Sequence, residues 1–363
     1  MGKRFVALAI SLLSVGATLL VPLLEQPASG ALASVTAERR PGYAPLARSG
    51  PRLSVPRAKL AAAVTCSGNF HANDLEPVLF NPATGVTARQ NFSWNYQNAF
   101  TAQHRPWCAV TPPHHTLGDI QISAEYIVYA LRHTHALAGR KIAILGHSQG
   151  GMSMRWALRF WPDTRPMVAD VISMAPDHHG TTLVDNVCTV GRTTCVAGLW
   201  QQASKAHFIE ALNSRAETFA GISYTSIYSK TDEVVMPTRG PRPTSALFTG
   251  MGRITNVTTQ SVCPLDLFEH LLIGTVDPVA YALVMDALRH RGPADPDRID
   301  SGVCGQLYMP GVDPADVADN LSLVAGLPYV LLVPVPDVSI TGLPQLKEEP
   351  PLRCYVYADG CSD

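Results

Sequence analysis

Residues 141 to 162 read KIAILGHSQGGMSMRWALRFWP. The run opens with a short apolar stretch typical of a buried strand, and Met152, Trp156 and Phe160 then recur every fourth residue, as on one face of a helix. Between the two lies a Gly-x-Ser-x-Gly pentapeptide centred on Ser148. A strand, a sharp turn with two glycines and a helix are the context in which this pentapeptide exposes a nucleophilic serine. The sequence therefore predicts Ser148 as a nucleophile.

The same alternation of apolar runs and helical periodicity continues along the chain. We expect strands at 77–80, 107–111, 141–146, 167–174 and 222–229, and helices at 119–137, 199–219 and 277–290. Strands that alternate with crossover helices form a mostly parallel central sheet with helices on its faces. With the strand–turn–helix around Ser148, the pattern predicts an α/β-hydrolase fold.

The N-terminal residues have the composition of an export signal. Lys3 and Arg4 precede an apolar run at 5–24, and an Ala-x-Ala pattern follows and ends at Ala33. We expect residues 1–33 to be a signal peptide that is cleaved near Ala33, so that the mature protein is secreted.

A change in composition marks the next two segments. Residues 34–60 are dominated by basic residues and prolines, which predicts a leader or pro-segment without packed structure. The remaining residues, 61–363, are expected to form one catalytic domain, because a chain that is 46% hydrophobic can build one large core.

Charge and hydropathy limit the partners. A formal net charge of −1 provides no field that would hold nucleic acid. The apolar region 312–336 is interrupted by Pro328 and Pro334 well short of the ~20 residues that a membrane span requires. We expect a monomer without a transmembrane span, and we interpret 312–336 either as a buried helix or as an apolar wall beside the active site.

A serine nucleophile needs a histidine base and a carboxylate that orients the histidine, and in this fold the chain order is serine, acid, histidine. Asp232 follows the expected strand at 222–229, although an ordinary turn aspartate is the alternative. Only His270 and His290 come after it. His290 stands near a predicted helix end, where it would interact with the helix dipole. We therefore predict Asp232 and His270 as the acid and the base.

Two backbone N–H groups are expected to bind the oxyanion that forms during acyl transfer. Gln149 directly follows the nucleophile, and Thr84 lies in the turn after an early strand. For Thr84, an ordinary turn residue is an equal alternative.

Cysteine and histidine usage bears on metal binding. Eight cysteines in an exported chain indicate disulfides, and Cys-x-x-Cys pairs typical of zinc sites are absent from the sequence. The adjacent pairs His114/His115 and His178/His179 could bind a metal, but neighbouring side chains diverge, so we interpret them as solvated surface histidines. We expect neither a metal nor another cofactor.

Several further motifs resemble those of the secreted lipases typified by Candida antarctica lipase B. They are Pro-Ala-Thr-Gly at 82–85, Ser-Gln-Gly-Gly at 148–151, Ala-Pro-Asp at 175–177 followed by Gly-Thr at 180–181, Trp-Gln-Gln at 200–202, Thr-Asp-Glu-Val-Val-Met-Pro at 231–237, and Val-Cys-Pro-Leu at 262–265 shortly before His270. The resemblance covers the chain from about Cys66 onward. It implies a cofactor-free triacylglycerol lipase and carboxylesterase with the same triad and the same oxyanion donors.

The resemblance also implies details that the residues alone do not give. It pairs Cys66 with Cys108, Cys263 with Cys304 and Cys354 with Cys361, which leaves Cys188 to pair with Cys195. It places Asp177 and Gln201 on the acyl side of the substrate pocket, although each could equally be a structural hydrogen-bonder. It places His147 where the yeast lipase carries a tryptophan that shapes its alcohol pocket.

We therefore predict a secreted serine esterase or lipase that hydrolyses apolar acyl esters through an acyl-enzyme, with a lipid or small ester as substrate and transient contact with a lipid interface. An acyltransferase or polyester hydrolase with the same triad is an alternative. A binding protein without turnover on the same fold is another.

Overall fold

The computed structural model describes residues 42–68, 70–322 and 342–360. The expected signal peptide at 1–33, the start of the predicted leader, residues 323–336 of the apolar region and Cys361 lie outside the described residues. The described residues belong to one compact unit, Pro41–Asp363.

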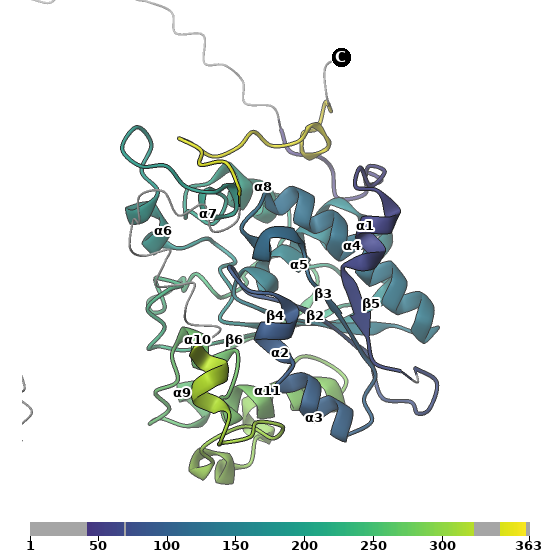
Figure 1. The fold of residues 1–363 in the computed structure, drawn as a ribbon, viewed down its shortest axis with the longest axis vertical. Coiled ribbons are helices and arrows are strands. Elements are labelled where there is room, and N and C mark those ends of the chain that lie inside the picture. Colours follow the sequence, from purple (N-terminus) through teal and green to yellow (C-terminus); the bar gives the residue numbers. More distant parts are fainter. Residues whose placement is uncertain (1–41, 69, 323–341, 361–363) are drawn as a thin grey trace, which may run out of the picture. The chain divides into compact units, whose positions relative to one another are not determined.

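The centre of this unit is a seven-stranded sheet (Figure 1). In spatial order its strands are β1 (Val64–Cys66), β3 (Trp107–Val110), β2 (Val78–Asn81), β4 (Ile142–His147), β5 (Val168–Met174), β6 (Ser223–Tyr228) and β7 (Arg253–Thr258). All neighbours are parallel except β1, which runs antiparallel to β3. The predicted α/β class and the mostly parallel sheet are confirmed.

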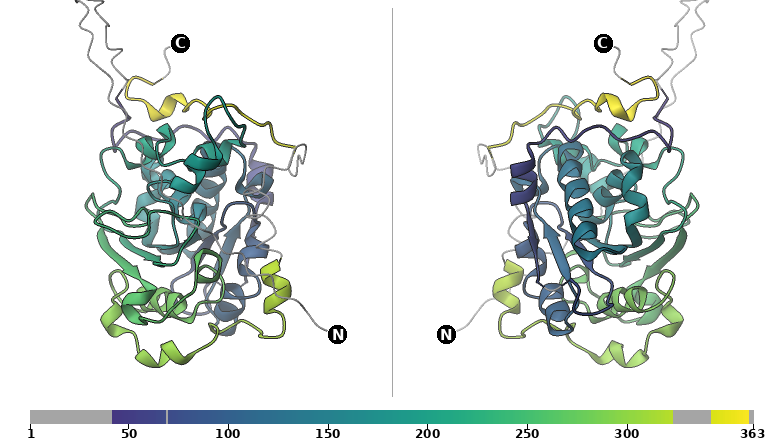
Figure 2. Two further views of the ribbon diagram at one scale, coloured as in Figure 1. Left: turned by 90° about the vertical axis from the view of Figure 1, so that its left-hand side faces the viewer. Right: turned by 90° about the vertical axis from the view of Figure 1, so that its right-hand side faces the viewer.

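Helices cover both faces of the sheet (Figure 2). They are α1 (Arg57–Ala62), α2 (Ala88–Phe92), α3 (Tyr96–Ala102), α4 (Ile120–Ala138), α5 (Gln149–Phe160), α6 (Thr182–Val187), α7 (Ala197–Trp200), α8 (His207–Asn213), α9 (Thr259–Val262), α10 (His270–Ile273) and α11 (Pro278–Arg289). Successive strand residues point to opposite faces, so Ile144 packs into one hydrophobic core and Leu145 into the other. Burial on both faces explains the continuous apolar run of β4.

One predicted helix, 199–219, is wrong, because it divides into α7 and α8. The backbone between them bonds to other parts of the fold instead of continuing the helix. Thr181 donates its N–H to the carbonyl of Gln202, and the N–H of Ser204 donates to the carboxylate of Asp185. These tertiary hydrogen bonds outweigh the local helical pattern.

The prediction that residues 34–60 have no packed structure is also wrong for the described residues 42–60, because several of them contact the hydrophobic core. Ala44 is 2% exposed, and its carbonyl accepts a hydrogen bond from Arg159 at 2.7 Å. The indole N–H of Trp161 donates to the carbonyl of Pro51 at 2.9 Å. A proline-rich segment resembles a linker in composition, but here its carbonyls satisfy buried donors on α5 and just after it.

Three disulfides join described cysteines: Cys66–Cys108, Cys188–Cys195 and Cys263–Cys304. The first links β1 to β3 at directly paired positions. Cys354 is also disulfide-bonded, and the cysteine expected to be its partner, Cys361, lies outside the described residues.

One stretch of the described chain, His270–Arg289, is long and apolar enough to cross a membrane, with a mean hydropathy of 1.6. It comprises α10 and α11, and 83% of it is buried in this fold. Helix α11 packs against β5 and β6, so its apolar residues belong to the core beside the sheet.

Candidate active site

Ser148 stands at a tight bend between β4 and α5, with φ 53° and ψ −127°. Residues other than glycine rarely adopt a positive φ, so the surrounding fold must hold the backbone of Ser148 in this conformation. A Cβ on Gly146 would lie 2.4 Å from the carbonyl carbon of Gly150, and one on Gly150 would lie 2.2 Å from the carbonyl oxygen of Asn81. Both glycines are therefore required for the bend that presents Ser148.

Three side chains that the sequence singled out form one hydrogen-bonded series. His270 Nε2 lies 3.0 Å from Ser148 Oγ, and His270 Nδ1 lies 2.8 Å from Asp232 Oδ2. Asp232 follows β6, His270 opens α10 and Ser148 precedes α5, so three separate βα connections meet at the carboxyl edge of the sheet. All three residues are buried: Ser148 is 4% exposed, Asp232 5% and His270 8%.

The surroundings fix the protonation state of this series. The other oxygen of Asp232, Oδ1, accepts the N–H groups of Val234 and Val235 at 2.9 and 2.8 Å, which holds the carboxylate toward His270. The carboxylate accepts a hydrogen bond from Nδ1–H, so the neutral imidazole keeps its proton on Nδ1 and its Nε2 can accept a hydrogen bond from the Ser148 hydroxyl. Burial alone would lower the pKa of His270, but Asp232 and then Glu233 raise it, and the net shift is upward.

The two residues expected to supply the oxyanion donors, Gln149 and Thr84, contact one another through their side chains. Gln149 is the first residue of α5, and Thr84 lies in the loop after β2; the Gln149 side-chain amide donates to Thr84 Oγ1 at 3.3 Å. Within the described part of the chain, neither backbone N–H donates a hydrogen bond. The N-terminus of α5 also favours negative charge at this position.

Comparison with known proteins finds similarity to lipases. No protein-family model matches the chain. Lipase B from Pseudozyma antarctica is 33% identical over 226 residues, which are 61% of this chain and 64% of that protein, so the match spans less than two thirds of the relative. The crystal structure of Aspergillus fumigatus lipase B superposes with a TM-score of 0.73 and 29% identity, over 88% of this chain and 78% of that one. The chain has the α/β-hydrolase fold and is similar to lipase B.

Gln202 is a residue beside the candidate site to which the sequence analysis gave no role. Its Oε1 accepts the hydroxyl of Thr84 at 2.9 Å, and its Nε2 donates to the carbonyl of Gly198 at 2.7 Å, which fixes the amide. Gln202 therefore orients the Thr84 side chain beside Ser148. The tandem glutamines at 201–202 were the available signal, but sequence does not say which of them faces the site.

Gln201 makes structural hydrogen bonds, which is the alternative to a role on the acyl side. It is fully buried, its Oε1 accepts the N–H of Ile120 and its Nε2 donates to Asp119, each at 2.7 Å. Both ends of the amide are used at the start of α4. Because neighbouring side chains diverge, Gln202 rather than Gln201 reaches Thr84.

Asp177 and His147 are both 1% exposed. Neither oxygen of Asp177 has a hydrogen-bond partner among the described residues, and burial raises its pKa to about 7. His147 has hydrogen-bond partners at both ring nitrogens, so it offers no polar atom to a substrate. The place of His147 at an alcohol pocket stays a prediction.

The two histidine pairs behave differently from one another. His114 is exposed and His115 half-buried, but His178 is fully buried and the half-buried His179 contacts Glu217 at 2.7 Å. The second pair is therefore not the solvated pair that we expected. Among the described residues, no group of three or more His, Cys, Asp or Glu side chains is arranged to hold a metal ion.

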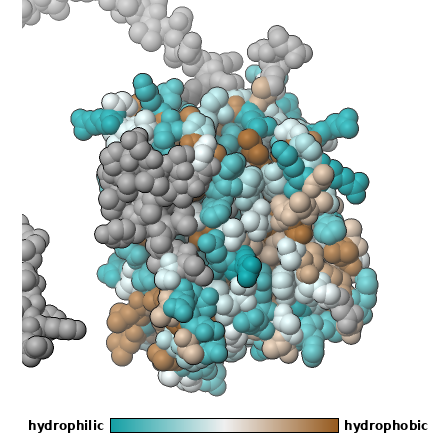
Figure 3. Space-filling model, in the orientation of Figure 1, coloured by the Kyte–Doolittle hydropathy of each residue, from teal (hydrophilic) through white to brown (hydrophobic). Residues whose placement is uncertain are grey.

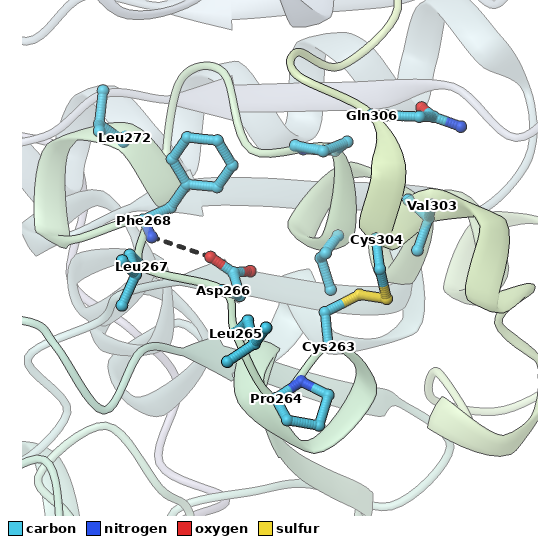
Figure 4. Close-up of a pocket in the computed structure, with 12 residues that line it drawn as sticks. Cys263, Pro264, Leu265, Asp266, Leu267, Phe268, Leu272, Val303, Cys304 and Gln306 are labelled. Carbon is cyan, nitrogen blue, oxygen red and sulfur yellow. Dashed lines mark hydrogen bonds between the residues drawn. A yellow bond between two sulfur atoms is a disulfide. The ribbon is translucent and has the colours of Figure 1, made fainter.

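A pocket of about 510 Å³ lies beside the loop that leads into His270 (Figure 4). Residues 263–268 and the Cys263–Cys304 disulfide form much of its lining, which includes none of the three triad candidates. Leu265 and Leu267 in the same loop are 91% and 77% exposed. Apolar side chains also gather around α9 at the lower left of Figure 3.

Proposed function

We propose that this chain is a secreted serine hydrolase of carboxylic esters, and specifically an esterase or lipase for apolar acyl chains. The hydrogen-bonded series from Asp232 through His270 to Ser148 is the observation that supports this most strongly. The similarity to lipase B supports the same reaction class. The four disulfide-bonded pairs expected in the chain fit an oxidising compartment.

In the proposed reaction, Ser148 Oγ attacks the ester carbonyl while His270 Nε2 takes the hydroxyl proton. The N–H groups of Thr84 and Gln149 then stabilise the oxyanion. His270 gives its proton to the departing alcohol, which leaves an acyl-enzyme on Ser148. Water, deprotonated by His270, releases the carboxylic acid and restores the serine.

Hydrolysis of a p-nitrophenyl ester series from short to long acyl chains tests this proposal, with the Ser148→Ala variant as the blank. We expect the wild type to turn over the esters at rates far above this blank, including esters with long acyl chains. Added alcohol should yield a minor share of transfer product. A folded wild type that releases no nitrophenol would favour the binding-protein alternative, and transfer that exceeds hydrolysis in water would favour an acyltransferase.

We also propose that Leu265 and Leu267 contact the lipid surface. Both side chains are exposed on the loop that precedes His270, and their transfer into lipid is favourable by about 1.5–3 kcal/mol for each fully buried leucine. Replacing both by serine is expected to lower the hydrolysis of emulsified triacylglycerol by about tenfold or more while changing that of a soluble short-chain ester little. Parallel assays on the two substrates measure this.

The matched control for this pair is Met251→Ser, since Met251 is 80% exposed but lies in the turn before β7. It should leave both activities unchanged. Equal losses on the emulsion and on the soluble ester by the double leucine variant would contradict a role at the lipid surface.

The pH dependence should respond to Glu233, whose negative charge helps to raise the pKa of His270. Removing that charge in Glu233→Gln destabilises the imidazolium and lowers this pKa. Because only neutral His270 accepts the serine proton, the acid limb of kcat/KM should move to lower pH. A pH profile with an uncharged ester measures the shift; an unchanged limb, or one moved to higher pH, would contradict the assignment of His270 as the base.

A further inference from the structure

The ring of His147 lies against the backbone of α10, the short helix that His270 begins. His147 Nε2 is 2.9 Å from the carbonyl oxygen of His270, and the two imidazole rings are 5.3 Å apart between centroids. At the other end of the helix, a Cβ on Gly274 would fall 2.3 Å from the His147 ring. His147 therefore contacts both ends of the helix that presents His270.

The carbonyl of His270 determines which nitrogen of His147 carries the proton. A carbonyl can only accept, so Nε2 must donate, and the neutral ring then has an acceptor at Nδ1. Asn91 Nδ2 lies 3.2 Å from that acceptor and donates to it. Complete burial lowers the pKa of His147 to about 3, which agrees with a neutral ring at every pH where the enzyme would work.

Asn91 extends these contacts to the loop that carries Thr84. Its Oδ1 accepts the N–H of Ala83 at 2.9 Å, and its own carbonyl accepts the side-chain amide of Asn95 at 2.9 Å. Asn91 is completely buried, and both polar atoms of its side chain are used. A continuous series of hydrogen bonds therefore runs from Ala83 through Asn91 and His147 to the backbone of His270.

We propose that Asn91 and His147 are positioning residues. Together they fix the loop of Ala83 and Thr84 and the backbone of His270 relative to each other, on either side of Ser148. This inference rests on the proposed function and adds two residues whose side chains make no hydrogen bond to the Ser148 hydroxyl. His147 is the last residue of β4 and directly precedes Ser148. The end of this strand therefore fixes the positions of Ser148, of the Thr84 loop and of His270.

The effect should be on the chemical step rather than on substrate binding. A shift of about 1 Å in a group that must transfer a proton can cost about 100-fold in rate. A fully satisfied buried hydrogen-bond series resists such a shift, whereas a partly satisfied one leaves unpaired groups and a looser geometry. Replacing His147 should therefore lower kcat while KM, which depends on the acyl pocket, stays nearly constant.

Three variants test this proposal. His147→Phe keeps a planar ring but loses both hydrogen bonds, and His147→Gln keeps an N–H donor that can reach the carbonyl of His270. His179→Phe is the matched control, because His179 also makes two hydrogen bonds, to Thr244 and Glu217, outside this series. For each, we would measure kcat and KM on a soluble p-nitrophenyl ester, the rate of fluorophosphonate labelling, and Tm.

We expect His147→Phe to lower kcat and the labelling rate together by about 10- to 100-fold, with KM within about threefold of the wild type. His147→Gln should recover most of that loss. His179→Phe should lower Tm without lowering kcat. If His147→Phe does not fold, Asn91→Leu tests the same series, since it leaves His147 in place but removes the donor to Nδ1, and it should lower kcat in the same way.

A folded His147→Phe or Asn91→Leu variant with wild-type kcat would overturn the proposal, as would His147→Gln with no recovery. In the wild type, nitrogen NMR that finds the proton of His147 on Nδ1 would also overturn it. These outcomes are separate from failure of the proposed function, in which the wild type itself would neither hydrolyse esters nor react with fluorophosphonate.

Discussion

Replacing Ser148 by alanine is expected to lower kcat for ester hydrolysis by about a millionfold, the scale found when a serine nucleophile is removed from a triad. The hydroxyl is the group that would form the covalent intermediate, and nothing else in the geometry replaces it. His270 Nε2 lies 3.0 Å from Ser148 Oγ. Removing the serine hydroxyl therefore leaves His270 with no hydroxyl proton to accept. Steady-state hydrolysis of a p-nitrophenyl ester, with Tm as a check of folding, measures the effect.

Ser153→Ala is the matched control for this variant. Ser153 is also a buried serine of α5, and its hydroxyl accepts a hydrogen bond from Asn81 at 2.9 Å. Its loss should cost about 1 kcal/mol of stability and leave kcat within a few fold of the wild type. If Ser148→Ala kept more than about a hundredth of the wild-type kcat, another nucleophile would have to carry the reaction.

Asp232→Asn is expected to lower kcat by about 10⁴-fold, because it changes the tautomer of His270 rather than its position. An asparagine can keep an oxygen toward the N–H groups of Val234 and Val235, but it then presents an amide donor to His270. The imidazole responds by placing its proton on Nε2, where it can no longer accept the serine hydroxyl. Measurements of kcat and kcat/KM on the same ester give the size of the loss.

A second buried carboxylate provides the control for Asp232. Asp286 pairs with Arg298 at 2.6 Å on α11, away from the candidate site, and Asp286→Asn removes a buried charge in the same way. This variant should lose stability, by about 3 kcal/mol, with little change in kcat. Similar kcat for Asp232→Asn and the wild type would show that Asp232 does not orient the base.

Much of the fold followed from local patterns in the sequence. The apolar run at 141–146 and the helical spacing after it predicted a strand and a helix, and these correspond to β4 and α5. The helix predicted at 277–290 corresponds to α11, and Asp277 caps it by accepting the N–H of Val279. The candidate triad followed from a rule of chain order combined with strand ends. In parallel sheets those ends share one edge, so Asp232 could be placed beside Ser148 without any long-range information. His270 followed by elimination, because His290, the other histidine after Asp232, stands at a predicted helix end.

What the sequence did not predict depends on tertiary contacts. The break between α7 and α8 arises from hydrogen bonds to Thr181 and Asp185, and the packing of residues 42–60 arises from buried donors such as Arg159. Which of the two glutamines at 201–202 contacts Thr84 depends on the direction of each side chain, and Gln202 is the one that does. The series from Asn91 to His147 joins residues 56 positions apart, and no periodic pattern in the sequence marks it.

The most direct test of the account is to react the folded protein with a fluorophosphonate and to map the adduct by mass spectrometry. We predict one phosphonyl group per chain, on the peptide that contains Ser148, with no adduct in Ser148→Ala and slow labelling in His270→Ala. An unlabelled wild type, or an adduct on a different residue, would contradict the claim that Ser148, activated by His270 and Asp232, is the nucleophile.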